Sequence, residues 1–191
     1  MKKFKKITVE DFEKNEHDDV ICDTKFNLLP EIEEQINLNL NACFHQFKEC
    51  LIDCESPIEQ MLALELENLH LENSTLFNSN LEIIGYEKQS EIECNKNVYR
   101  VDFLIPVIFY KNIRRIYIVE CDGYEFHQKT KEQVQNDYIR QRNLEMAGYR
   151  IIKFTGSEVY NNAQDCALQV LKYIQNDFNR IGIEYGYKKN S

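Results

Sequence analysis

The chain has 191 residues, of which 43% are hydrophobic and 29% are charged, as in ordinary globular proteins and unlike disordered ones. This length suits one domain with a sizeable core and an additional segment, and it is short for two full domains. The sequence contains no apolar run as long as a transmembrane helix and no signal-peptide pattern. We therefore expect a soluble cytoplasmic protein without a membrane partner, while the oligomeric state stays unknown.

The charge is unevenly distributed along the chain. Residues 1–97 hold 9 basic and 21 acidic residues, a balance of −12, whereas residues 98–191 hold 14 basic and 11 acidic residues, a balance of +3, for a total of −9. A surface that binds phosphate is therefore expected in the C-terminal half. The acidic N-terminal segment is instead a candidate for binding a protein partner.

The seven cysteines are odd in number and form no CxxC pair, which favours a reducing compartment over a disulfide framework. Four potential zinc ligands lie close together in the sequence, namely Cys43, His45, Cys50 and Cys54. Their spacing matches no common zinc module, so buried thiols are the favoured interpretation and a zinc site is the alternative.

The first predicted elements are helices. Apolar residues recur at helical spacing over 31–52 and predict an amphipathic helix that packs on the core as an appendage. The stretch Ser56-Pro57-Ile58-Glu59 then has the pattern of a helix start. Serine can cap the helix, proline suits its first position, and Glu59 completes a capping box. We expect this second helix to continue to about residue 72.

Strands and helices follow in the order strand, strand, strand, helix, strand, helix. The predicted strands cover 81–89, 98–109, 115–121 and 149–154, and the predicted helices cover 131–147 and 164–179. The second and third strands are joined by a short polar link, which predicts an antiparallel hairpin. Residues 1–55 are expected to form a helical extension, 56–180 the main domain, and 181–191 a tail.

Two carboxylates lie in strands of this predicted hairpin. Asp102 lies in YRVDFLIP, where alternation puts Arg100, Asp102 and Leu104 on one face and Val101 and Phe103 on the other. A carboxylate in such a strand is costly to bury unless it is paired, hydrogen-bonded or bound to a cation.

Glu120 ends the apolar run of the next strand, and Asp122 follows on the same face. If the two strands pair, Asp102 and Glu120 converge at one end of the sheet. Converging carboxylates suit a hard divalent cation such as Mg²⁺. The alternative is that they form structural ion pairs with cations such as Arg100 or Lys153.

Four motifs carry a family resemblance. In chain order they are SPIE (56–59), YRVDF (99–103), IVECDGYEFH (118–127) and NDYIRQRNLEMAGYRIIKFTGSEV (136–159). Together they resemble the PD-(D/E)xK nuclease superfamily, most closely its very-short-patch-repair-like and DUF559-type branch. The resemblance implies an α/β (α+β) restriction-endonuclease-like core, αβββαβ, whose central mixed four-stranded sheet is flanked by helices. It also implies cleavage of nucleic-acid phosphodiesters with Mg²⁺ or Mn²⁺.

The resemblance assigns metal ligands residue by residue. Asp102 resembles the first metal-binding aspartate, and Glu120 resembles the acidic residue of the (D/E)xK motif. The backbone carbonyl of Cys121 would be a further ligand. Glu59 matches a helix glutamate that is often directed at the metal, although a purely structural capping box fits it equally well.

The remaining assignments concern catalysis and nucleic-acid contacts. Asp122 occupies the place of the motif lysine, as in the ExDG pattern of the DUF559-like branch. Lys153 is a candidate substitute cation, or else a surface or structural lysine. His127 matches a histidine that can act as general acid or base or contact the phosphate, its alternative being a loop histidine bonded to the backbone.

The D-x-x-R helix of the resemblance includes Arg140 and also Arg142, which with Lys129 are candidate nucleic-acid-binding residues. The leading hypothesis is a metal-dependent endonuclease that acts on DNA. The alternative is a catalytically weak nucleic-acid-binding or assembly module that retains the nuclease fold.

Overall fold

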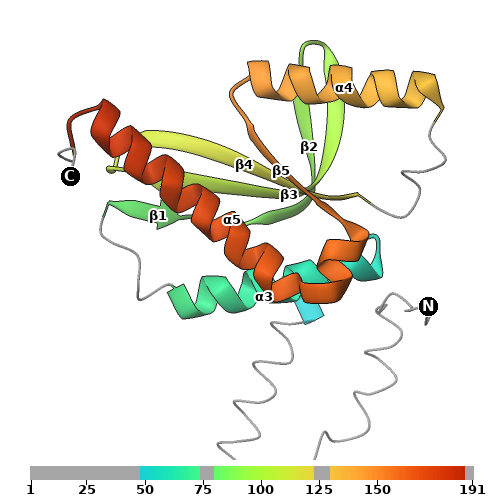
Figure 1. The fold of residues 1–191 in the computed structure, drawn as a ribbon, viewed down its shortest axis with the longest axis horizontal. Helices are drawn as coiled ribbons and strands as arrows, with labels where there is room; N and C mark the ends of the chain where they lie inside the picture. The colour runs from blue at the N-terminus through green and yellow to red at the C-terminus, as the bar shows by residue number, and fades with distance from the viewer. Residues whose placement is uncertain (1–47, 74–79, 123–129, 188–191) are drawn as a thin grey trace, which may run out of the picture.

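The computed structural model describes residues 48–73, 80–122 and 130–187. Within these ranges the elements follow one another as shown in Figure 1. They are α3 (Pro57–Asn73), β1 (Leu81–Ile83), β2 (Glu87–Cys94), β3 (Asn97–Phe109), β4 (Ile113–Asp122), α4 (Lys131–Met146), β5 (Arg150–Thr155) and α5 (Gly156–Glu184). No helix in the described ranges is long and apolar enough to cross a membrane.

The strands form one mixed sheet in the order β1-β3-β4-β5, with β2 paired to β3 beside this path. The β3–β4 pair is antiparallel, which confirms the predicted hairpin, and β4–β5 is parallel. A parallel pair needs a long crossover connection, and α4 lies in that connection. The predicted α+β class, a mixed sheet flanked by helices, is confirmed.

The sheet has one strand more than predicted. The segment 81–89, expected as one strand, is divided between β1 and β2, and both pair with β3. β2 joins β3 through Asn95 and Lys96, whose φ angles of +50° and +66° are those of a two-residue hairpin turn with both central residues left-handed. The sequence around β2, QSEIEC, is too polar to have been recognised as the rest of a strand.

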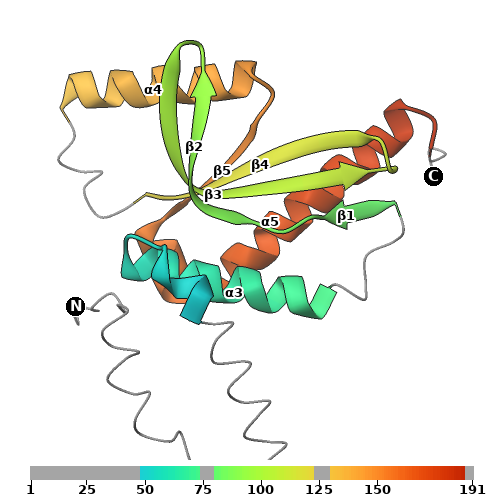
Figure 2. The same ribbon diagram turned by 180° about the vertical axis from the view of Figure 1, so that it is seen from behind.

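The sheet bends so that its strands contribute to two separate cores. Phe103 and the later inward residues of β3 pack in a large core with α3 and α5. Val101 instead packs in a small core with Ile118 and with Leu144 of α4. The prediction that Val101 and Phe103 share one face is therefore wrong, because the strand bends and twists between them. Figures 1 and 2 show β2 and the start of β3 rising toward α4, away from the long β3–β4 ribbon.

The helices cover the sheet unequally. α3 and α5 contact each other and lie on the large core, whereas α4 lies over the raised end of the sheet. α5 begins eight residues before the predicted 164, because Thr155 and Glu158 form a reciprocal capping box. A kink at Asn162, where φ is −161° and ψ is 78°, separates this first part from the remainder.

The packed unit extends past both predicted domain boundaries. Cys50 and Cys54 are buried in the large core, although they precede residue 56. Ile181 of α5 is 2% exposed in the same core, although it follows residue 180. Cys50 and Cys54 form no disulfide and are buried, while Cys43 and His45 lie outside the described residues. Of the predicted helix 31–52, the described part, 48–52, is helical, and the rest lies outside the described residues.

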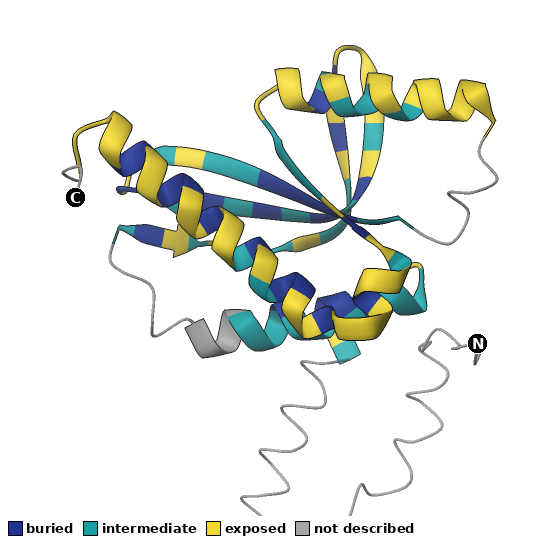
Figure 3. Cartoon of the chain, viewed as in Figure 1, coloured by how far each residue is buried: buried dark blue, intermediate teal, exposed yellow. Residues whose placement is uncertain are grey.

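The attachment of α4 is open to a direct test, because Leu144 is its one buried residue. Leu144 is 0% exposed and Met146, two residues later, is 82% exposed, and Figure 3 shows how much of α4 faces solvent. We expect Leu144→Ala to lower the free energy of unfolding by about 2–5 kcal/mol, the usual cost of a core cavity. Met146→Ala, the matched control, should stay within about 0.5 kcal/mol. Chemical denaturation measures both, and equal effects would contradict the packing described above.

Candidate active site

The candidate site lies where β3 and β4 separate. Their ladder ends at the pair Phe103–Val119, and the following residues of β4 pair with β5 alone. Beyond that point the Asp102 side chain replaces the missing backbone partner. Its Oδ2 accepts a hydrogen bond of 2.7 Å from the Cys121 backbone N–H. Asp102 is thereby fixed at the bend, next to the end of β4.

Three carboxylates from three elements interact at this bend. The pKa of Asp102 is raised to about 6, first by burial and further by the negative charges of Glu59 and Glu120, although the Cys121 hydrogen bond and Arg140 oppose the shift. The sequence prediction that Asp102 and Glu120 converge agrees with this geometry. Like charges held close together in a half-buried place are the usual environment of a bound cation.

Glu120 is almost fully buried, at 5% exposure, and is approached by two cations. Lys153 Nζ lies 3.0 Å from Oε2, as expected from the register in which the two residues are partners on β4 and β5. Arg140 Nη2 lies 2.5 Å from Oε1. The same nitrogen donates to the Arg100 carbonyl at 2.6 Å, and Oε1 has no hydrogen bond of acceptable geometry. Arg140 therefore neutralises Oε1 by charge without satisfying it as an acceptor.

Glu59 caps the start of α3. Its Oε1 accepts from the Ser56 hydroxyl and its Oε2 from the Glu55 backbone N–H, both at 2.7 Å, while the Glu59 N–H donates to the Ser56 hydroxyl at 3.2 Å. The capping geometry predicted from SPIE is therefore present. Hydrogen bonds already engage both carboxylate oxygens of Glu59. A metal-binding role of Glu59 therefore stays a prediction.

Gln89 is a site residue that the sequence did not reveal. Its φ of +50° interrupts the β2–β3 ladder directly opposite Asp102, and its Nε2 donates to Glu59 Oε2 at 2.7 Å. It thus connects the bend of the sheet to the start of α3. The strand predicted from sequence ended at Gln89, and nothing in its pattern indicated the left-handed backbone or the hydrogen bond to Glu59.

The remaining predicted residues are placed as follows. Asp122 is the last residue of β4, half-buried and in register with Thr155 of β5. Arg142 is exposed on α4. Arg140, by contrast, contacts Glu120, and its guanidinium lies 6.0 Å from the centre of the Tyr99 ring. His127 and Lys129 lie outside the described residues, so their roles stay predictions.

The donor set has the chemistry for Mg²⁺. The described residues contain no group of three or more histidine, cysteine, aspartate or glutamate side chains arranged around a common metal position. Mg²⁺ is nevertheless usually held by one or two carboxylates, with water and substrate phosphate completing its octahedron. Asp102 and Glu120 supply such a pair, and the buried Glu120 Oε1 has an unused acceptor position. The residues present therefore fit a hard divalent cation.

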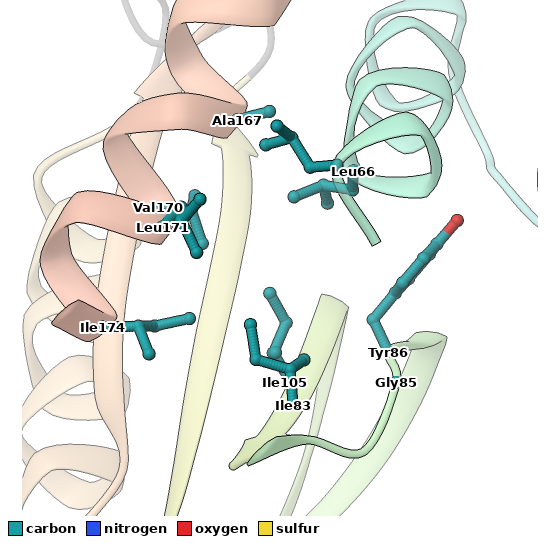
Figure 4. A pocket seen from close by; sticks show the side chains of 10 residues that line it. Leu66, Ile83, Gly85, Tyr86, Ile105, Ala167, Val170, Leu171 and Ile174 are labelled. Carbon is teal, nitrogen blue, oxygen red and sulfur yellow. The ribbon is translucent and has the colours of Figure 1, made fainter. Parts of the chain in front are cut away.

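A cavity elsewhere in the molecule does not compete with this site. It lies between α3, α5 and the sheet, and Figure 4 shows its lining, which is apolar except for the Tyr86 hydroxyl. Its volume is about 40 Å³, which is too small for a nucleotide. The Tyr86 hydroxyl is already engaged with Cys50 Sγ at 3.0 Å and with Glu67. The cavity is a packing defect of the large core.

Comparison with known proteins gives a family match that covers these residues. A family model of restriction-endonuclease-like proteins, REase_MTES_1575, matches residues 76–174. This range includes β3, β4 and β5, and hence Asp102, Glu120 and Lys153. No curated protein and no solved structure matches the chain.

The raised pKa of Asp102 makes a pH-dependent prediction. Because this pKa rises from 3.8 to about 6 on folding, the stabilising contribution of the group is present below about pH 4 and is lost as the pH rises through 6. We compare the free energy of unfolding of Asp102→Asn with that of the wild type in metal-free buffer. The difference, variant minus wild type, should rise by on the order of 3 kcal/mol from pH 4 to pH 8. Urea unfolding at both pH values measures the gain.

Glu91→Gln is the control for this comparison, because Glu91 is an exposed carboxylate on β2. It should show a pH-dependent difference no larger than about 0.5 kcal/mol. A stability difference between Asp102→Asn and the wild type that is the same at both pH values would show that Asp102 titrates normally.

Proposed function

The chain belongs to the restriction-endonuclease-like family REase_MTES_1575, whose members are nuclease-like, and on this premise we propose that it is a metal-dependent nuclease hydrolysing DNA phosphodiester bonds. The observation that carries the proposal is the pairing of Asp102 and Glu120 at the separation of β3 and β4, with a lysine in register beside them. An acidic pair next to a cation suits phosphodiester hydrolysis, in which charge develops on phosphate oxygens.

Asp102 and Glu120 would hold Mg²⁺ or Mn²⁺, with the Cys121 carbonyl as a further ligand. When bound, such an ion lowers the pKa of a coordinated water and stabilises charge on the phosphoryl oxygens. The hydrogen bond from the Cys121 N–H keeps the Asp102 carboxylate oriented at the end of β4. Gln89 and the capping contacts hold Glu59 in place behind it, so the first carboxylate pair is supported by a fixed second layer.

Lys153 is proposed to take the part that the motif lysine plays elsewhere in the superfamily. Asp122, at the motif position, is an anion and cannot stabilise charge on phosphate. Lys153 reaches the Glu120 carboxylate from the neighbouring strand β5, and the Lys153 side chain remains 30% exposed. It can therefore stay in contact with Glu120 and still meet a phosphate that arrives from solvent.

Arg140 and Arg142 are proposed to bind the nucleic acid. Arg140 is 25% exposed at its side chain and lies beside Glu120, so it can contact a phosphate close to the reacting one. Arg142 is exposed on the same helix and would contact the backbone further away. Guanidinium groups suit this use, because they bind phosphate through two parallel hydrogen bonds.

A second candidate function follows from the charge balance of Glu120. Lys153 and Arg140 together already neutralise its carboxylate, and a metal ion must compete with them. If Lys153 and Arg140 keep the metal ion away from Glu120, the chain binds nucleic acid and cleaves it weakly or not at all. This is the binding or assembly module, and the experiments below separate it from the nuclease.

Cleavage of plasmid and single-stranded DNA with Mg²⁺ or Mn²⁺ tests the proposed function. Asp102→Asn and Glu120→Gln should each lower the cleavage rate by roughly a hundredfold or more, because each removes a charge that holds the metal ion. Glu91→Gln, on an exposed position of β2, is the control and should cleave like the wild type. Unchanged cleavage by both site variants would refute the assignment of the active site. A wild type that binds DNA but does not cleave it with either metal ion would establish the binding module.

The part played by Lys153 is tested separately. Lys153→Ala should lower kcat by roughly ten- to a hundredfold with little change in KM, since its charge acts on the reacting phosphate. Lys153→Arg should restore part of the rate, because it keeps a cation next to Glu120. Steady-state cleavage of a labelled oligonucleotide gives both parameters. A rise in KM alone would reduce Lys153 to a substrate-binding residue.

A further inference from the structure

A second cluster of charged side chains lies outside the candidate active site, around Asp177 of α5. Asp177 is 8% exposed. Its Oδ2 accepts from the buried Tyr117 hydroxyl at 3.0 Å, and its Oδ1 accepts from Arg180 Nη2 at 2.7 Å. Arg150 Nε lies 3.5 Å from Oδ2. This cluster joins α5 to the middle of β4 and to the beginning of β5.

The cluster carries more positive charge than its carboxylate requires. Two guanidinium groups, those of Arg150 and Arg180, contact the one carboxylate. Arg115 lies two residues before Tyr117 on β4, hence on the same face of the strand, and its charge acts on the Tyr117 hydroxyl. Arg115 donates to the Arg114 backbone carbonyl rather than to an acid. The surplus positive charge is available to an anion from solvent.

The guanidiniums remain accessible. The Arg150 side chain is 40% exposed and that of Arg180 is 59% exposed. Among the described residues, Arg150 contacts an acceptor through Nε alone, which leaves its two Nη groups for a ligand. A cluster that served only to attach α5 would need a single cation for Asp177. The exposed arginines are therefore able to bind an anionic ligand from solvent.

An exposed aromatic ring lies beside these cations. Tyr173 is 43% exposed, and its ring meets that of Tyr117 edge-on, with centroids 6.2 Å apart. Tyr173 precedes Asp177 by one helical turn, and Arg180 follows Asp177 by three residues, so the three residues share one side of α5. An exposed ring next to guanidiniums suits a nucleic acid, whose bases stack and whose phosphates bind arginine. An acidic peptide would use the charges but not the ring.

The sheet connects this cluster to the candidate active site. Arg150 and Lys153 are both on β5, the last strand of the described sheet path. By alternation they lie on opposite faces of it. On β4, Arg115 and Glu120 are five residues apart, roughly 17 Å at the usual rise per residue of a strand. A nucleic-acid strand that passes over the outer edge of β5 can therefore reach both places.

We propose that Arg115, Arg150 and Arg180, with Tyr173, form a second binding surface for the backbone of the nucleic acid whose reacting phosphate lies at Asp102 and Glu120. This inference rests on the proposed function for its choice of ligand. The surface holds the strand away from the cleavage position, on the opposite face of β4 and β5. It adds affinity for long substrates and takes no part in the chemistry.

Fluorescence anisotropy with a labelled single-stranded DNA of about 20 nucleotides, in EDTA at several salt concentrations, tests the surface without cleavage. Arg115→Ala is the primary variant, because it leaves Asp177 paired; Arg180→Ala is the second. Each should weaken binding about three- to tenfold and reduce the slope of log affinity against log salt by about 0.7. Lys96→Ala, which removes one exposed positive charge at the β2–β3 turn, is the control and should change neither quantity.

Substrate length supplies the second readout. Arg115→Ala should cleave a dinucleotide at the wild-type rate and a long strand with a raised KM. Wild-type affinity and salt slope in both folded arginine variants, verified by thermal unfolding, would overturn the proposal. So would equally strong, Arg115-dependent binding of a polyglutamate peptide. If the wild type cleaves nothing but its DNA binding depends on Arg115, the proposed nuclease fails and the binding surface stands.

Discussion

The structure depends on one local event, the separation of β3 from β4 at Asp102. From the hairpin turn to the pair Phe103–Val119, the two strands form an ordinary antiparallel ladder. Beyond that pair, the Cys121 N–H has no backbone partner on β3. A buried N–H without an acceptor is costly, and the Asp102 carboxylate supplies the acceptor. Gln89 takes a left-handed conformation opposite the same residue. The bend that divides the molecule into two cores and the placement of the first carboxylate therefore have one cause.

Charge at this bend is only partly balanced. Asp102 lies near two other carboxylates, and burial together with their charges raises its pKa to about 6, so ionising it is less favourable in the folded protein than in the unfolded chain. Lys153 and Arg140 balance Glu120, and α4 carries Arg140 although Leu144 is its only buried residue. Hydrogen bonds from Arg140 to the Arg100 carbonyl and from Asn143 to the Tyr99 hydroxyl supplement this apolar contact. The cation nearest Glu120 Oε1 is thus held in place from β3 as well as from α4.

Much of this arrangement could be predicted from sequence, and the exceptions have physical reasons. Asp102 and Glu120 lie in strongly apolar strands, so their strand assignment and convergence followed from pattern alone. The start of α3 followed from SPIE. β2 was missed because its polar residues lack a clean alternation, and the two cores were missed because period-two reasoning assumes a flat strand. The Arg140 contact required the position of α4 relative to the sheet, which no local pattern encodes. The capping box at Thr155 and Glu158, by contrast, was legible as T-x-x-E.

The two charged clusters use opposite faces of the same two strands. Tyr117 of β4 and its register partner Arg150 of β5 face α5 and Asp177, while Glu120 and its partner Lys153 lie on the opposite face, on the side of α4. Because β5 is the last strand of the sheet path, the strand edge joins the faces by the shortest route.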